Sequence, residues 1–442
     1  MRTPGSIERS FVCSPIRRDA LPLPPQPSLE QYKKRAKDLV KASQSSDPNA
    51  IRDWAANWMD ALVRLSGLTI TPQLPVRIDR WTDQLEKFAR YKLAEKGTLA
   101  AAQFVMARAQ GFESWLKFGK HIEAEARANS PVSDFEHAAD AIVAGGIATL
   151  EKLLRDHPDL IRATSTRRHQ ATLLHYVAAN GVEGYRQKTP KNLVQIAELL
   201  LNTGPDVNAM ADVYGGSTTL ALVATSVHPE RAGVQTALLQ LLLDHGATID
   251  TANSPAGPLI NICLANGRAQ AAEFLAGRGA SLDLEGAAGL GRLNIVKSYF
   301  DESGGRRQDP TNGQIEHAFL RACEYGRNKV VDFLLQRGVS PQAQANTGQT
   351  ALHWAVIGGH IDTITLLLTH GAQLEAKNSY GGTALGQALW SAIHGDSRID
   401  HVPVIELLLN TGAKIEEGTI TWLTQQKMDS RLQQRIADLL NR

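Results

Sequence analysis

Apolar residues recur at three- and four-residue spacing along much of this chain, in short segments that end at glycine. Residues 350–371 show the pattern most clearly, with the sequence TALHWAVIGGHIDTITLLLTHG. Within them, Leu352, Ala355 and Val356 would share one face of a helix whose first turn Thr350 can cap. A second apolar stripe follows a pair of glycines, which tolerate the positive φ that ends a helix. The segment therefore predicts two short helices joined by a tight turn.

The helix pair recurs at a regular interval. The closing glycines Gly246 and Gly279, and again Gly338 and Gly371, lie 33 residues apart. One such pair cannot bury its own apolar stripe, so neighbouring pairs must stack. We count eight pairs, of which the fifth is the most degenerate, and they begin near Phe135, Ala171, Ser217, Pro258, Ala287, Gln314, Thr350 and Thr383. The sequence therefore predicts an all-α solenoid.

Short signature sequences within these pairs resemble the ankyrin repeat. They are TALH at 350–353 and HGA at 370–372, with partial matches in TLLH at 172–175 and TALG at 383–386. The resemblance spans roughly residues 134–415 and implies helix-turn-helix repeats separated by hairpin loops. It also implies that His175 and His353 support those loops through hydrogen bonds rather than act in catalysis. Trp354, which follows the signature histidine, is expected to pack between repeats.

The resemblance implies protein recognition, because ankyrin arrays bind partners on a concave face built from hairpin tips and first helices. The side chains at the expected tips are mixed in charge, which favours a protein partner over a polyanion. The candidate partner-binding residues are Asn208, Met210, Asp212, Tyr214, Gln342, Gln344, Asn346, Glu375, Lys377, Asn378 and Tyr380.

The pattern divides the chain into four segments. We expect a disordered Pro-rich tail, a helical N-terminal region, the ankyrin-repeat array and a C-terminal capping helix, at residues 1–27, 28–130, 131–420 and 421–442. Within the helical region, the sequence AQFVMARAQGFESWLKFGKHIEA resembles a segment of bacterial ankyrin-repeat proteins that carry such a region. That resemblance implies no activity. Ser28 with Gln31 predicts a capping box for the first helix, and Asp47 with Pro48 predicts the start of a second.

Charge and composition narrow the function classes. The formal net charge is +2, so no protein-wide field would hold nucleic acid. The basic cluster of the first helix lacks interleaved aromatic residues, and we interpret it as a solvated face: Lys33, Lys34, Arg35, Lys37 and Lys41. Three cysteines without CxxC spacing favour a reduced compartment, and there is neither an apolar run long enough for a membrane span nor a secretory signal. We expect a cytoplasmic monomer.

Catalytic signatures are absent from the sequence. It contains no GxSxG, no HExxH, no phosphate loop and no CxxC pair, and its thirteen histidines show no metal-ligand spacing. GLGRLN at 289–294 is only half of a dinucleotide fingerprint. We therefore expect neither an enzyme nor a bound cofactor or metal.

Three of the pairs are longer than the clear unit, and the extra residues fall between their two helices. The inserted sequences are NGVEGYRQKTPKN, SVHPERAGVQ and IHGDSRIDHVP, in the second, third and eighth pairs. Helix-to-helix turns lie at the edge of an ankyrin stack opposite the hairpin loops. The second and third insertions belong to neighbours and should touch, which would bring together Asn180, Tyr185, Arg186, Gln187, His228, Glu230 and Arg231.

Two interpretations of these insertions remain open. The cluster could hold an anion or a carboxylate, or its polar groups could satisfy one another. The leading hypothesis for the chain is a non-enzymatic scaffold that binds a protein on its concave face. The alternative is a small-molecule or anion-binding protein, or an enzyme, that uses the inserted loops.

Overall fold

The computed structural model describes residues 23, 27–65, 74–94, 97–127, 129–250, 257–301, 310–426 and 428–440. The chain divides into two compact units, Met1–Thr251 and Ala252–Arg442. Most of the expected Pro-rich tail lies outside the described residues. The four expected segment boundaries stay predictions.

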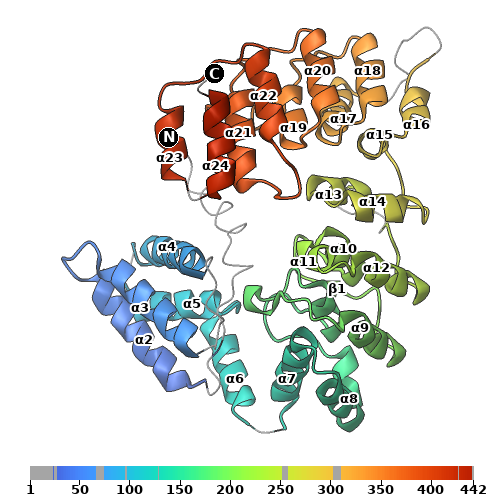
Figure 1. Ribbon diagram of the computed structural model, residues 1–442. Coiled ribbons are helices and arrows are strands. Elements are labelled where there is room, and N and C mark those ends of the chain that lie inside the picture. Colours follow the sequence, from blue (N-terminus) through green and yellow to red (C-terminus); the bar gives the residue numbers. More distant parts are fainter. Residues whose placement is uncertain are drawn as a thin grey trace. The chain divides into compact units, whose positions relative to one another are not determined.

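The first unit begins with a helical bundle (Figure 1). Its helices are α2 (Leu29–Ser43), α3 (Ala50–Leu65), α4 (Leu74–Leu93), α5 (Leu99–Ala109) and α6 (Trp115–Glu125). Their apolar faces form one core that includes Trp58, Phe112 and Phe118. The expected capping box is wrong, because the Ser28 side chain makes no cap hydrogen bond. The second helix begins at Ala50 rather than at Pro48.

Three helix pairs complete the first unit. They are α7 (Pro131–Ala144) with α8 (Ile147–Asp156), η3 (Leu173–Ala178) with α9 (Leu193–Asn202), and α10 (Thr219–Thr225) with α12 (Gln235–Asp244). The first members pack in one row and the second members in another. A short β-hairpin precedes α10. In this hairpin, β1 (Met210–Ala211) pairs antiparallel with β2 (Ser217–Thr218).

The second unit holds the remaining pairs in the same two-row arrangement. They are α13 (Leu259–Ala265) with α14 (Ala269–Ala276), α15 (Leu284–Gly289) with α16 (Leu293–Ser298), α17 (Asn312–Glu324) with α18 (Asn328–Gln336), α19 (Ala351–Ile357) with α20 (Ile361–Thr369), and α21 (Ala384–His394) with α22 (Val402–Asn410). Two further helices follow, α23 (Thr419–Gln425) and α24 (Ser430–Leu440). The predicted all-α fold of stacked helix pairs is confirmed.

Local signals place the helix ends of the clearest repeat. The Thr350 hydroxyl accepts a hydrogen bond from the backbone N–H of His353 at 3.4 Å, as an N-cap does. Gly359 ends α19 at a φ of 72°. Gly358 stays in the helical region, so only the second glycine of the pair supplies the positive φ.

The signature histidine links neighbouring repeats. His353 Nδ1 accepts from the Thr350 backbone N–H at 3.3 Å, which leaves the proton on Nε2. His353 Nε2 then donates to the carbonyl of Gly382 in the next hairpin loop at 3.0 Å. The expected loop-supporting role of this histidine is confirmed. Within the described residues, no helix is long and apolar enough to span a membrane.

The inserted sequences are ordered segments. In the second pair the first helix is 3-10, and the insertion contains the short 3-10 helix η4 (Gly184–Arg186). In the third pair the insertion forms α11 (Val227–Arg231). Gly181, the second residue of the first of these insertions, has a φ of 76°, and a Cβ there would meet Val213 Cγ2 at 3.0 Å. Glycine therefore permits both the turn and the close approach to the next loop.

Candidate functional site

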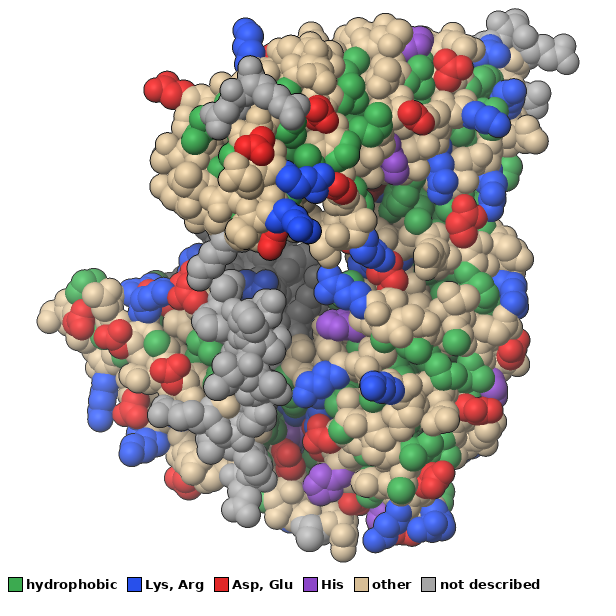
Figure 2. Space-filling view, in the orientation of Figure 1, with side chains coloured by type: hydrophobic (Ala, Val, Ile, Leu, Met, Phe, Trp, Pro, Cys, Tyr) green, Lys and Arg blue, Asp and Glu red, His purple; other side chains and the backbone are tan. Residues whose placement is uncertain are grey.

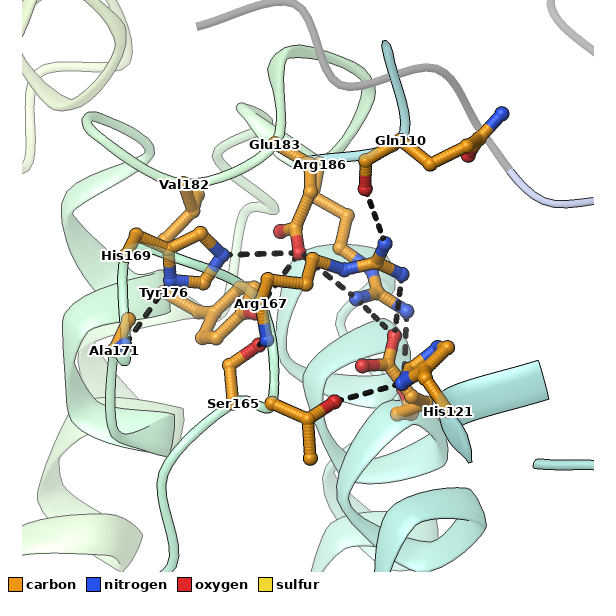
Figure 3. Close-up of polar contacts among 12 residues, drawn as sticks. Gln110, His121, Ser165, Arg167, His169, Ala171, Tyr176, Val182, Glu183 and Arg186 are labelled. Carbon is orange, nitrogen blue, oxygen red and sulfur yellow. Dashed lines mark hydrogen bonds and ion pairs between the residues drawn. The ribbon is translucent and has the colours of Figure 1, made fainter. Parts of the chain in front are cut away.

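Two arginines and two glutamates form a buried network inside the first unit (Figure 3). Glu136 Oε2 lies 3.1 Å from Arg167 Nη2 and 2.6 Å from Arg186 Nη1. Glu183 Oε1 lies 2.6 Å from Arg167 Nε. No member is more than 3% exposed. We call these four residues the buried ionic network.

The members of the network come from three separate segments. Glu136 is on α7, and Arg167 is in the tight loop that precedes η3, where the Ser165 hydroxyl accepts from the Arg167 backbone N–H at 3.2 Å. Glu183 directly precedes η4 and Arg186 is its last residue, and the Arg186 N–H donates to the Glu183 carbonyl at 2.8 Å. The inserted loop of the second repeat is therefore fixed to the first repeat by opposite charges.

Mutual pairing keeps these buried groups ionised. Burial alone would raise the pKa of Glu136, but the guanidinium groups of Arg167 and Arg186 outweigh it and hold that pKa at about 2. Burial would also raise the pKa of Glu183. His169 and the two arginines outweigh it and hold that pKa well below its usual range. Such pairing offsets the large cost of removing charges from water.

The same loop joins the repeats to the N-terminal bundle. Arg167 Nη1 donates to the carbonyl of Gln110 at 3.1 Å, and its guanidinium lies 5.3 Å from the centre of the Phe112 ring. The Arg168 backbone N–H donates to the Gly111 carbonyl at 2.9 Å. His121 Nδ1 lies 2.7 Å from the Thr166 hydroxyl. The N-terminal bundle thus packs against the end of the repeat stack at this loop.

The candidate residues of the second repeat's inserted loop do not share one set of partners. Arg186 is 3% exposed and also pairs with Asp140 of α7 at 2.8 Å. Gln187 Nε2 donates to the Val182 carbonyl within its own loop at 2.9 Å. Asn180 alone reaches the third repeat, where its Nδ2 donates to the Leu222 carbonyl at 3.2 Å.

The second and third insertions were expected to touch, but Arg186 of the second insertion does not pair with the third one. Among the described residues, no hydrogen bond or ion pair joins Tyr185 or Arg186 to His228 or Arg231. The physical reason is that the buried Arg186 charge needs carboxylates, which α7 supplies, whereas the third insertion folds into its own helix, α11. Glu136 and Arg167 were missed because nothing local in the sequence indicates that they are buried together.

Several hairpin-tip candidates link one loop to the next. Asn208 Nδ2 donates to the Gly246 carbonyl at 3.0 Å, while its Oδ1 accepts from the Thr248 N–H at 2.8 Å. Gln342 Nε2 donates to the Gly371 carbonyl at 2.7 Å, and its Oε1 accepts from the Gln373 N–H at 3.0 Å.

Two more tip candidates also have partners inside the protein. Glu375 Oε1 accepts from the Lys414 N–H at 2.9 Å. Asn378 is buried, and its Oδ1 accepts from the Tyr380 and Gly382 N–H groups, each at 3.0 Å. These side chains hold the loops in place, so they are poorly available to a partner.

The remaining tip candidates face outward. Tyr380 is 81% exposed, Met210 54% and Tyr214 46%. Gln344 and Asn346 are exposed. Asp212 lies 3.9 Å from Arg168, Lys377 pairs with Glu416 at 2.6 Å, and the Tyr214 hydroxyl donates to Asn180 at 2.9 Å.

The comparison with known families and proteins agrees with this geometry. A family model described as ankyrin repeats (3 copies) matches residues 284–378 and 319–418. Rabankyrin-5 of Mus musculus is 26% identical over 59% of this chain, and the chain spans only 27% of that relative. Notch-regulated ankyrin repeat-containing protein A of Danio rerio is 32% identical over 23% of the chain, which covers 88% of that relative.

A solved structure is also similar to this chain. The human ASB11 ankyrin repeat domain is 22% identical and has a TM-score of 0.32, with 63% of this chain and 99% of that chain covered. The relatives named above are animal proteins, so the expected bacterial type gains no support. The signature motifs, the histidine that links the loops and the zebrafish relative together show that the chain belongs to the ankyrin-repeat family.

Proposed function

We propose that this chain is a non-enzymatic interaction scaffold that binds a protein partner with hairpin tips and first helices of its repeats. The family membership supports this class of function, and the mixed surface charge favours a protein over nucleic acid. Basic and acidic side chains are interspersed over the face drawn in Figure 2. We further propose that the protein acts in the cytoplasm as a monomer.

The observation that carries the proposal is a set of outward-facing side chains in the second unit. Tyr380 at a hairpin tip is 81% exposed, and Trp390 on the first helix α21 is 50% exposed. Gln344 and Asn346 are exposed on the preceding tip. We call these four residues the recognition surface. Tyrosine and tryptophan dominate the energetics of protein interfaces, so their exposure here favours a binding role.

The surroundings of these aromatic residues are suited to binding. The Asn378 side chain fixes the Tyr380 backbone through the N–H hydrogen bond at 3.0 Å, so little loop entropy would be lost when a partner binds. The Trp390 ring centre lies 5.3 Å from that of His394. On the neighbouring helix, Trp354 is half-buried, and its indole N–H is buried without a hydrogen-bond acceptor. Trp354 also packs against the core of the second unit, so it does not belong to the recognition surface.

A capture experiment tests the proposal. The full chain, a Tyr380→Ala/Trp390→Ala variant and a Leu116→Ala control would each be used to enrich proteins from a lysate of the native organism. Leu116 is 67% exposed on α6 of the first unit, so its removal matches the loss of exposed apolar surface without changing a residue of the recognition surface. We expect a partner that the wild type and the control retain and the double variant loses. Equal enrichment by all three would contradict the proposal.

The inserted loops provide a weaker alternative. Arg186, the strongest anion-binding candidate there, is already paired with Glu136 and Asp140. Among the described residues there is also no group of three or more His, Cys, Asp or Glu side chains that could hold a metal. These observations favour a structural role for Arg186 over a catalytic one.

A further inference from the structure

Basic residues are concentrated around the second helices of three consecutive repeats in the second unit. These are the fourth, fifth and sixth pairs, whose second helices are α14, α16 and α18. Residues 266–280, 291–301 and 327–338, which hold these helices, contain seven Lys and Arg residues against three Asp and Glu residues. The corresponding residues of the next two pairs, 359–371 and 395–412, contain one against four. The excess of positive charge is therefore local, although the whole chain carries only +2.

Three of these basic residues occupy equivalent positions in successive repeats. Arg268, Arg292 and Arg327 are the N-cap residues of α14, α16 and α18. Each directly follows a glycine with a positive φ, the conformation that ends the first helix of the pair. The three arginines therefore lie at the helix-to-helix turns, along the edge of the repeats opposite the hairpin loops. We call these three residues the arginine edge.

Two guanidinium groups of the arginine edge share one carboxylate. Arg292 Nη2 lies 2.5 Å from Glu273 Oε2, and Arg327 Nη2 lies 3.9 Å from Glu273 Oε1. Glu273 is on α14, so these contacts join all three second helices. Arg327 Nε also donates to the Gly289 carbonyl at 2.8 Å, which fixes its guanidinium. The side chain of Arg292 is 45% exposed, so a partner can reach it. One carboxylate for two guanidinium groups leaves a net positive charge.

Three other carboxylates of the same repeats are held by partners of their own. Glu285 on α15 and Glu324 on α17 both pair with Arg321. Asp332 accepts a hydrogen bond within its own helix, α18. Lys329 of α18, by contrast, is exposed and forms no ion pair with any described residue. It adds positive potential two residues beyond Arg327.

The surroundings of the arginine edge favour an acidic protein segment over a membrane or a nucleic acid. Among the described residues of the second unit, the exposed large apolar side chains are Tyr380, Trp390, Ile415 and Ile420, and none belongs to these three pairs. The edge therefore lacks an apolar anchor for a bilayer and an exposed ring on which a base could stack. Glu273 shows that its guanidinium groups receive a carboxylate.

We propose that the arginine edge binds an acidic, extended segment of a protein partner. The axes of packed neighbouring helices are about 8–10 Å apart, and an extended chain advances about 3.3 Å per residue. Acidic residues at every third position of the segment would therefore each meet one arginine. The guanidinium groups offer paired N–H donors that match carboxylates. The edge lies opposite the hairpin tips of the recognition surface, so it is a second interaction surface and does not depend on the first.

Fluorescence anisotropy with the full chain tests this binding. The probe is a labelled peptide of six Glu-Gly-Ser units, and the control peptide has Gln in place of Glu, at the same ionic strength. We expect saturable binding of the acidic peptide alone. Arg292→Gln/Arg327→Gln should weaken it by about tenfold or more. Lys414→Gln/Arg431→Gln removes the same charge from exposed residues outside the arginine edge and should change binding by less than about threefold.

A third variant has an effect of the opposite sign. Glu273→Gln removes the carboxylate that occupies both guanidinium groups, so the acidic peptide should bind about threefold or more tightly. All variants should unfold near the wild-type temperature, because surface ion pairs contribute little to stability.

Four results would overturn the proposal. They are no binding of the acidic peptide, equal losses in the two double variants, no gain in Glu273→Gln, and tighter binding of an oligonucleotide or of phosphatidylserine vesicles through the same arginines. The last result would assign the edge to a different class of partner.

Discussion

Individual charged residues stabilise this protein where they are buried together. Arg167 lies at the junction of the N-terminal bundle, the first repeat and the inserted loop, with contacts to Gln110, Glu136 and Glu183. Its neighbour Arg168 is partly exposed and lies 3.9 Å from Asp212. The two adjacent arginines therefore provide a matched comparison of a buried and a surface ion pair.

Replacing Arg167 should destabilise the first unit strongly. Arg167→Met leaves Glu183 with fewer counter-charges in a buried site, and we expect a loss of about 3–5 kcal/mol in the free energy of unfolding. Arg168→Met should cost below about 1 kcal/mol. Urea denaturation of both variants measures the difference. Equal losses would show that the buried network contributes no more than a surface pair.

The signature histidine of the second repeat makes stability depend on pH. Burial lowers the pKa of His175 from 6.5 to about 4, so the folded protein keeps it neutral. The unfolded chain takes up the proton near pH 6.5, so the stabilisation is complete above that pH and is lost as pH falls towards 4. The loss should reach about 3 kcal/mol, since one pKa unit corresponds to about 1.4 kcal/mol.

Denaturation at pH 7 and pH 5 measures this dependence. Glu136, with its pKa held at about 2, keeps its charge in the folded protein throughout that interval and is only slightly protonated in the unfolded chain at pH 5, so it contributes little. His175→Gln should reduce the difference in unfolding free energy between the two pH values. An unchanged difference in the variant would assign the pH dependence to other groups.

At the scale of elements, the sequence predicted the helix pairs well because their signals are local. Thr350, Gly359 and the apolar stripe between them specify one helix and its end without reference to the rest of the chain. The sequence showed where the inserted loops lie and how long they are. It did not predict which residues those loops contact. Arg186 pairs with Glu136 across 50 residues of sequence, and no spacing rule in a single sequence indicates such a pair.

The hairpin loops illustrate the same limit. Gln342 and Gln344 look alike in sequence, yet one links two loops and the other is exposed. Gln342→Ala removes both hydrogen bonds to the next loop, and we expect a loss of about 1–2 kcal/mol in unfolding free energy. Gln344→Ala should stay within about 0.5 kcal/mol of the wild type. Thermal and urea unfolding of the two variants decide the matter. A cost for Gln344→Ala equal to that for Gln342→Ala would show that the link does not stabilise the stack.

At the scale of the whole molecule, the chain combines an N-terminal bundle with ankyrin repeats distributed over two compact units. In the first unit, the bundle covers the end of the repeat stack through the loop that carries Arg167. Repeat arrays need such covering at their ends, because an open end would expose apolar surface. In the second unit, a hairpin tip and α21 carry the exposed aromatic side chains Tyr380 and Trp390, and we propose that this unit binds the partner.

Hydrogen exchange of the chain with its captured protein partner tests the scaffold account most directly. If the recognition surface binds the partner, backbone protection should increase in residues 343–348, 376–382 and α21. The inserted loops at 180–192 and 226–234 should keep the exchange rates of the free chain. Protection concentrated in those loops, with none at Tyr380 and Trp390, would contradict the account.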